Sequence, residues 1–129
     1  MKKFFVLRQE LAEATVPEAV RDIHVNLDNR QHAIDEYQYG PANPAEPGNY
    51  WKELGKIWGI DADQASTMRC SNCAAFNVKP AMRKAIANNI SDNGMDVVDL
   101  ANLGYCELFH FKCAGDRSCS AWLTNGPLK

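Results

Sequence analysis

The sequence lacks any apolar run long enough to span a membrane. Two lysines followed by FFVL open the chain, but this run ends at Arg8, and acidic residues follow at Glu10 and Glu13. Such a run is too short for the hydrophobic region of a secretory signal peptide. We therefore expect a protein that is synthesised and kept in the reducing cytoplasm, with no membrane partner.

The sequence also lacks a basic excess and the common catalytic motifs. Its 14 Lys and Arg residues are scattered and are outnumbered by 16 Asp and Glu residues, which gives a formal net charge of −2. Nucleic-acid-binding surfaces need clustered positive charge, so nucleic acid is not expected as a partner. No glycine-rich phosphate loop, paired catalytic carboxylates or nucleophile–base pair is visible, and Asp96 and Asp99 fit polar positions of a helix. An enzyme is therefore not expected.

Residues 1–47 are predicted to form a helical arm with a proline-rich linker, and residues 48–129 a separate domain. Thr15 and Pro17 are typical of a helix start, whereas residues 4–14 fit either a strand or a helix. Polar residues in the middle of the arm suggest two short helices. The apolar positions that fall on one helical face are Val20, Ile23, Leu27, Ile34 and Tyr37.

The proline-rich segment from Pro41 to Asn49 is predicted to detach this arm from the rest of the chain. A helix with an exposed apolar stripe gains stability when the stripe is buried on another surface. We therefore expect the arm to bind other protein subunits of an assembly. The alternative is that the arm folds back over the chain's own core.

Four short helices are expected downstream. Residues 50–58 should form a helix between Asn49 and Gly59, with Tyr50, Leu54, Ile57 and Trp58 on one face, and a second should run from the capping residue Asp61 to Met68. This pair is either a DNA-binding helix-turn-helix or a hairpin packed beside a metal site, and its lack of exposed basic residues favours the hairpin. Pro80 should open a third helix, with Met82, Ile86 and Ile90 on one face, and a turn at residues 91–94 should precede a fourth over residues 95–103.

Five cysteines stand in two groups: Cys70 and Cys73 in a C-x-x-C knuckle, and Cys106, Cys113 and Cys119 further on. Five thiols cannot all pair within one chain, and disulfides are disfavoured in a reducing cytoplasm. A knuckle directs two thiolates to one side, and two more thiolates complete a site for zinc or for a 4Fe–4S cluster. The spacing does not choose between these two, and free or redox-active thiols are a third possibility.

The residues beside the cysteines favour an iron–sulfur cluster over zinc. They are apolar and aromatic, and rings of this kind exclude water and so protect a cluster. Taken singly, each ring is better explained as a core residue, and only together, beside the thiols, do they favour a cluster. His110 is either a ligand or a packed, partly exposed histidine, and the second interpretation is favoured. The predicted cluster shell is Phe76, Tyr105, Phe109 and Trp122.

Three segments resemble the cysteine signatures of high-potential iron–sulfur proteins, which hold one 4Fe–4S cubane and carry single electrons. The segments are CSNCAAF from Cys70, CELF from Cys106 and CSAW from Cys119, and the resemblance covers residues 68–124. It implies that the ligands are Cys70, Cys73, Cys106 and Cys119, and that Cys113 is an extra thiol or substitute ligand. The insert between Cys73 and Cys106 is longer than that family usually has.

The combined pattern MRCSNCAAF, GYC, HFKC and CSAW is also similar to small cysteine-rich proteins of tailed bacteriophages. That resemblance implies a particle component or an assembly factor. The expected fold is mostly α, with irregular loops and short strands around a metal cluster. The expected function is 4Fe–4S binding in a mainly structural role. The alternatives are a one-electron carrier and a zinc-stabilised interaction module.

Overall fold

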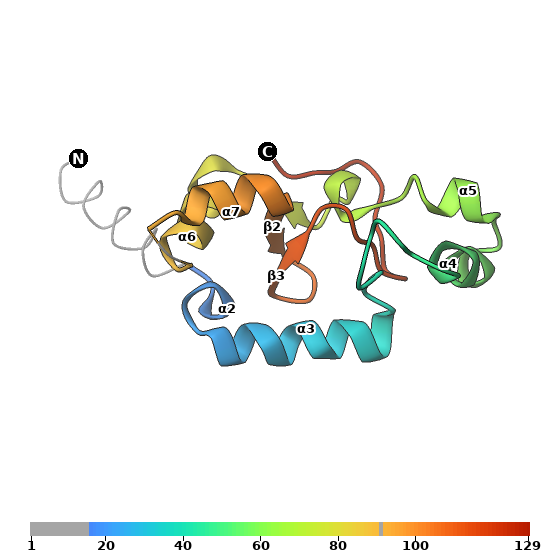
Figure 1. Ribbon diagram of the computed structural model, residues 1–129, viewed down its shortest axis with the longest axis horizontal. Helices are drawn as coiled ribbons and strands as arrows, with labels where there is room; N and C mark the ends of the chain where they lie inside the picture. The colour runs from blue at the N-terminus through green and yellow to red at the C-terminus, as the bar shows by residue number, and fades with distance from the viewer. Residues whose placement is uncertain (1–15, 91) are drawn as a thin grey trace, which may run out of the picture.

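The computed structural model describes residues 16–90 and 92–129, and the predictions for residues 4–14 and for Thr15 lie outside this part. Helices surround a small antiparallel sheet in the described part (Figure 1), so that this part is a mixed α/β domain, with the helices and short strands that were predicted. The strands are β1 (Phe76–Asn77), β2 (Leu103–Cys106) and β3 (Phe111–Ala114). The helices are α2 (Glu18–Arg21), α3 (Ile23–Tyr37), α4 (Tyr50–Trp58), α5 (Ala62–Ala65), α6 (Pro80–Asn88) and α7 (Gly94–Ala101), with a 3₁₀ turn η1 (Cys70–Asn72). None of the described helices is both long and apolar enough to cross a membrane.

The sheet has the strand order β1-β2-β3, with both pairs antiparallel. Cys106 pairs with Phe76 on one side and with Phe111 on the other, and Gly104 pairs with Cys113. Added to Gly104, a Cβ atom would lie 2.6 Å from the Phe76 ring, so only glycine fits at this position. The register therefore places two cysteine-bearing strands side by side at the centre of the fold.

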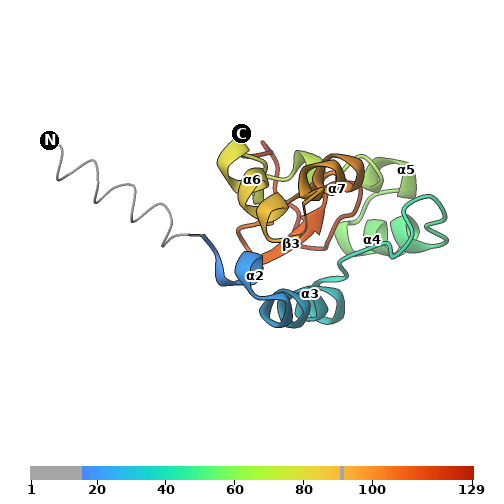
Figure 2. The same ribbon diagram turned by 60° about the vertical axis from the view of Figure 1, so that its left-hand side comes forward.

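Helix α3 covers the free edge of β3, which would otherwise carry unpaired backbone groups. The Lys112 N–H donates to Asn26 Oδ1 at 2.7 Å, and the Ala114 N–H donates to the Tyr39 hydroxyl at 3.0 Å. Figure 1 shows α3 lying along the sheet, and Figure 2 shows the same arrangement from a second direction. Side-chain oxygens from α3 and the residues just after it thus take the place of a fourth strand.

The prediction of a detached arm is wrong for residues 16–47, and the alternative that the arm folds back describes them. The break between its two helices falls at Asp22, whose carboxylate accepts from the His24 N–H at 2.9 Å. The polar middle of the predicted stripe faces the domain, because Asn26 is buried against β3. The apolar stripe is divided: Val20 is buried, whereas Ile23 and Leu27 are 53% and 50% exposed.

Within residues 16–90 and 92–129, the buried side chains form three cores. One joins α2, α6, α7 and β2 around Val20, Ile86, Val98 and Tyr105. A second joins α4 and α5 around Trp51 and Leu54. The third lies between them, under α3, and contains cysteines from η1, β2, β3 and the C-terminal loop.

The α4–α5 hairpin packs beside the cysteine core, as the favoured interpretation expected. Gly59 ends α4 with φ 72°, and the Asp61 carboxylate accepts from the Gln64 N–H at 2.7 Å. Helix α5 ends at Ala65, so the predicted extension to Met68 is wrong. Ile57, which was predicted to lie on the apolar face, is 54% exposed, whereas Trp51, which was not assigned to that face, is buried. The hairpin is anchored by hydrogen bonds from the Tyr50 hydroxyl to Ser118 O (2.9 Å) and from Trp58 Nε1 to Ser120 O (3.0 Å).

Helices α6 and α7 follow the predicted order with shorter ends. Pro80 is the first residue of α6, as expected, and Ile86 is fully buried, but the helix ends at Asn88. Helix α7 ends at Ala101 because Leu103 already belongs to β2. Asp99 forms an ion pair with Arg83 at 3.2 Å, which agrees with its interpretation as a polar helix position.

Candidate metal centre

All five cysteines line one small cavity beside the sheet. They reach it from η1, from β2 and β3, and from the loop that follows β3, and none of them forms a disulfide. The other side chains around the cavity are apolar or aromatic. They are Tyr39, Ala75, Phe76, Leu108, Phe109, Phe111 and Ala121.

The knuckle that carries Cys70 and Cys73 is a single 3₁₀ turn, as the C-x-x-C spacing predicts. The Cys73 N–H donates to Cys70 O at 2.9 Å, and the Arg69 N–H donates to Asn72 Oδ1 at 3.0 Å. These two bonds close the turn at both ends and direct both thiols to the same side. The Ser71 N–H also donates to Gly115 O at 3.0 Å, which ties the knuckle to the residue after β3.

The C-terminal tail wraps the outside of the knuckle. The Leu123 N–H donates to Cys73 Sγ at 3.4 Å, and the Ala74 N–H donates to Leu123 O at 2.9 Å. A Cβ atom on Gly126 would overlap the backbone of Cys73, so the tail can pass at this distance only with glycine there. The fourth predicted ligand, Cys119, lies on the same C-terminal segment as these contacts.

Cys106 ends β2 and opens the turn to β3. The Phe109 N–H donates to Cys106 Sγ at 3.3 Å, and the His110 N–H donates to Cys106 O at 2.8 Å. His110 has a left-handed backbone (φ 59°), and its carbonyl accepts from Asn29 Nδ2 of α3 at 2.6 Å. The strained turn is thus held from outside by α3, and it aims backbone N–H groups at a cysteine sulfur.

Backbone N–H groups face the sulfurs of three predicted ligands. Besides the bonds to the sulfurs of Cys73 and Cys106, the Ala121 N–H donates to Cys119, where burial raises the pKa and this bond offsets part of the increase, and the Leu108 N–H donates to Cys106 and lowers its pKa. Hydrogen bonds of this kind stabilise thiolate sulfur and tune the reduction potential of an iron–sulfur cluster. The cavity therefore offers both the donors and the second layer of contacts that a thiolate-bound metal group needs.

Burial sets the protonation of these thiols. It raises the pKa of Cys73 and of Cys113, and it raises the pKa of Cys119 to about 12. The pKa of Cys106 is lowered to about 7, first because of the hydrogen bond with the Cys113 thiol and then because of the Phe109 and Leu108 N–H groups. Several thiolates can coexist in such an apolar site only when a cation compensates them, so metal binding here would release protons.

Two of the four predicted shell residues line the cavity, and two do not. Phe76 and Phe109 line it as expected. Tyr105 lies in the core with α6 and α7, because neighbouring residues of a strand point to opposite faces and Cys106 takes the face toward the cavity. Trp122 packs against the cysteine core without lining the cavity, and its indole N–H donates to Arg69 O and to Asn72 Oδ1, both at 2.9 Å.

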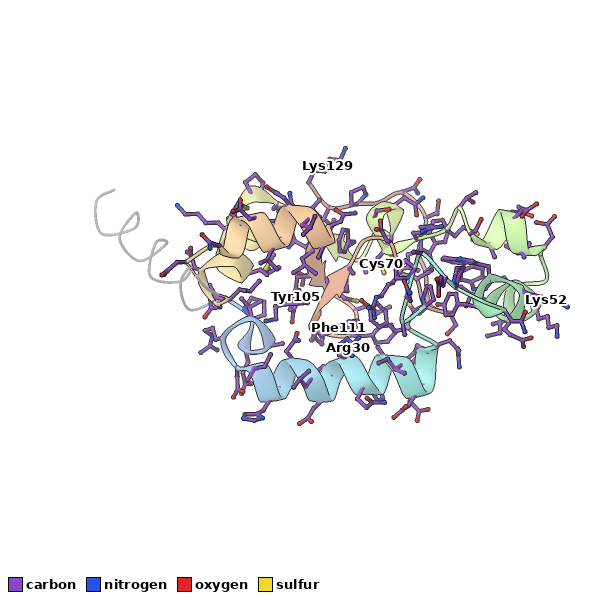
Figure 3. The ribbon with its side chains drawn as sticks, viewed as in Figure 1. Arg30, Lys52, Cys70, Tyr105, Phe111 and Lys129 are labelled. Carbon is purple, nitrogen blue, oxygen red and sulfur yellow. The ribbon has the colours of Figure 1, made fainter. Side chains whose placement is uncertain are left out.

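Tyr39 and Phe111 also line the cavity, although neither is among the four predicted shell residues. Their rings meet edge to face at 4.8 Å, and the Arg30 and Arg117 guanidinium groups lie 5.9 and 5.5 Å from the Tyr39 centroid. In Figure 3, Arg30 and Phe111 are labelled in the region between α3 and the sheet. Alternation along β3 from Cys113 could have identified Phe111, whereas no local signal identifies Tyr39, which precedes the first cysteine by many residues.

His110 is exposed and does not line the cavity, which agrees with its interpretation as a packed surface histidine. Among the residues that the structure describes, no three His, Cys, Asp or Glu side chains are grouped in the way that holds a single metal ion. The chemistry of the site is thus that of five thiols around an apolar hollow. No family model matches this chain, and no curated protein or solved structure matches it either.

Proposed function

We propose that this chain binds one 4Fe–4S cluster through Cys70, Cys73, Cys106 and Cys119, and that the cluster acts mainly as a structural cross-link. The observation that carries the proposal is the convergence of every cysteine of the chain on one apolar cavity. A cubane cluster takes four thiolate ligands. The proposal includes no catalytic step.

Three features of the cavity support a cluster as its occupant. Its walls are apolar and aromatic, which excludes water from a group that water and oxygen degrade. Backbone N–H groups donate to Cys73 Sγ and to Cys106 Sγ. The thiols with raised pKa values are stabilised as thiolates only by bonding to a cation.

A structural role follows from the segments that the four ligands join. The knuckle lies far before β2 in sequence, and the C-terminal loop carries Cys119 13 positions after Cys106; the three segments meet around the cavity. When bound, the cluster would supply four covalent links between them. In a domain of this size, such links stabilise the folded state because the cluster binds the folded site and not the unfolded chain, so its binding free energy adds to the stability.

One-electron transfer is the second candidate, and one observation favours it. Leu108 lines the cavity and is also 43% exposed, so the cavity lies directly under the surface at this residue. A carrier needs its redox centre close to an exposed surface. A reversible one-electron wave in protein-film voltammetry, with the same structure in both states, would favour the carrier over the purely structural role.

Metal and sulfide content test the proposal. Protein purified without oxygen should be brown and contain about four iron and four inorganic sulfide per chain. Both analyses are referred to the protein concentration from amino-acid analysis. Colourless protein with one zinc per chain and no sulfide would establish the zinc-stabilised module instead.

Hydrogen exchange tests the structural role. Removing the cluster should reduce protection across residues 68–124 far more than across residues 50–67, because metal binding and folding are coupled where ligands come from separate loops. The α4–α5 hairpin serves as the internal reference, since its core contains no cysteine. Equal protection of residues 68–124 with and without the cluster would contradict a structural role.

A role as a phage particle component or assembly factor is supported by the sequence resemblance alone. We propose that contact with other subunits uses the outer face of α3, where Ile23 and Leu27 are half exposed. This replaces the detached arm as the partner-binding surface. The inner face of the same helix is already occupied by β3.

A further inference from the structure

The cavity contains one thiol more than a cubane cluster uses. Cys113 is 2% exposed and lines the same hollow as the other four cysteines. Cys106 pairs with Phe111, two residues before Cys113 on β3, so Cys106 and Cys113 are diagonal neighbours on one face of the sheet. The knuckle that carries Cys70 is hydrogen-bonded to the residue that follows β3. A free cysteine elsewhere in the core would have no such neighbours.

The backbone holds Cys113 in this place without help from a metal. On one side, residues 111–114 pair with β2, and Cys113 itself lies opposite Gly104. On the other side, the N–H groups of its two neighbours donate to Asn26 and to Tyr39. Strand alternation turns Phe111 and Cys113 to the same buried face. The thiol is therefore presented to the cavity by a rigid, two-sided strand.

We propose that Cys113 is a reserve ligand, which replaces Cys106 or Cys70 when either is lost. The inference rests on the cluster-binding function proposed above. In the replacement, the Cys113 thiol releases its proton to solvent and its sulfur forms the iron–sulfur bond that the missing cysteine no longer supplies. No electron is transferred, so no oxidant or reductant is needed.

Alanine variants test the proposal, because alanine, unlike serine, leaves no oxygen that could bind iron. Full-length protein is produced without oxygen as wild type, Cys106→Ala, Cys113→Ala and the double variant. Iron, sulfide and visible circular dichroism are measured on each. We expect both single variants to retain more than half of the wild-type iron and sulfide, and the double variant to retain less than a tenth. The visible circular dichroism of Cys106→Ala should differ from that of wild type because one ligand has changed.

A second pair of variants keeps the test decisive if Cys106→Ala does not fold, which far-ultraviolet circular dichroism would reveal. Cys70→Ala, alone and with Cys113→Ala, should behave in the same way as the Cys106 pair. The matched comparison is Cys119→Ala, which should lose its cluster whether or not Cys113 is present. Loss of the cluster from Cys106→Ala and Cys70→Ala as complete as from Cys119→Ala would overturn the reserve-ligand proposal.

The two proposals fail in different ways. Wild-type protein without iron and sulfide would refute the cluster itself, and with it the reserve ligand. Wild-type protein with a full cluster, together with empty Cys106→Ala and Cys70→Ala variants, would refute the reserve ligand alone. Retention by these two single variants and loss from the double variants would support both.

Discussion

Cys119→Ala is expected to lose its cluster completely. Cys119 is the one cysteine on the loop after β3, whereas the fifth thiol, Cys113, lies within β3 beside β2. Without it, three thiolates remain for a group that takes four. Iron and sulfide per chain, measured after purification without oxygen, should fall to below about a tenth of the wild-type content, and the brown colour should be lost.

Cys113→Ala is the matched control, because it removes a thiol from the same cavity and leaves the four proposed ligands in place. It should keep the wild-type iron and sulfide content. Cys73→Ala should behave as Cys119→Ala does, since it also removes one of the four proposed ligands and Cys73 lies outside the two strands that carry Cys106 and Cys113. If Cys113→Ala were empty and Cys119→Ala full, the assignment of ligands from the sequence resemblance would be wrong.

Ala33→Asp is expected to destabilise the domain by about 3–5 kcal/mol, the usual cost of an uncompensated buried charge. Ala33 is fully buried and lies in the cysteine core, where α3 meets Tyr39 and Phe111. A carboxylate there must either separate α3 from the sheet or become protonated. The melting temperature should fall by more than about 10 °C. Bleaching of the visible absorbance in air should be faster, because α3 then covers the cavity less well.

Leu27→Asp places the same charge on the outer face of the same helix, where the side chain is 50% exposed. It should cost less than about 1 kcal/mol. This variant also tests the proposed partner surface, because it should keep its cluster and its stability while losing its contact with other subunits. Equal melting temperatures for Ala33→Asp and Leu27→Asp would contradict the packing of α3 on the cysteine core.

Local sequence patterns predicted most of the elements and their caps. Gly59 ends α4, Asp61 caps α5 and Pro80 opens α6, because each of these signals acts within one helical turn. The ends of α5 and α6 were placed too far along the chain. Where a helix ends depends on packing, which no local pattern records. Met68 lies beyond the turn that ends α5, and Ile90 lies beyond the turn that ends α6.

The spacing of the cysteines and the residues beside them were sufficient to predict that the cysteines meet at one site. The C-x-x-C knuckle forms a turn by itself, and the apolar residues beside Cys106 and Cys119 indicated a dry site, which is the cavity that all five thiols line. Strand alternation explains why one predicted shell residue lines the cavity and another does not. Phe76 faces the cavity, whereas Tyr105 faces the core on the other side of the sheet.

The tertiary structure alone decided the role of the N-terminal helix. A polar residue in mid-helix predicts a solvated face, yet Asn26 is buried because β3 leaves a backbone N–H unpaired at its edge and the amide oxygen pairs with it. Tyr39 reaches the cavity for the same reason, through its bond to Ala114. The sequence determined which residues can bind a metal group, since thiol chemistry is a property of the residue. Which side chains enclose that group depends on which strand edge remains open, and an edge exists only once the sheet has formed.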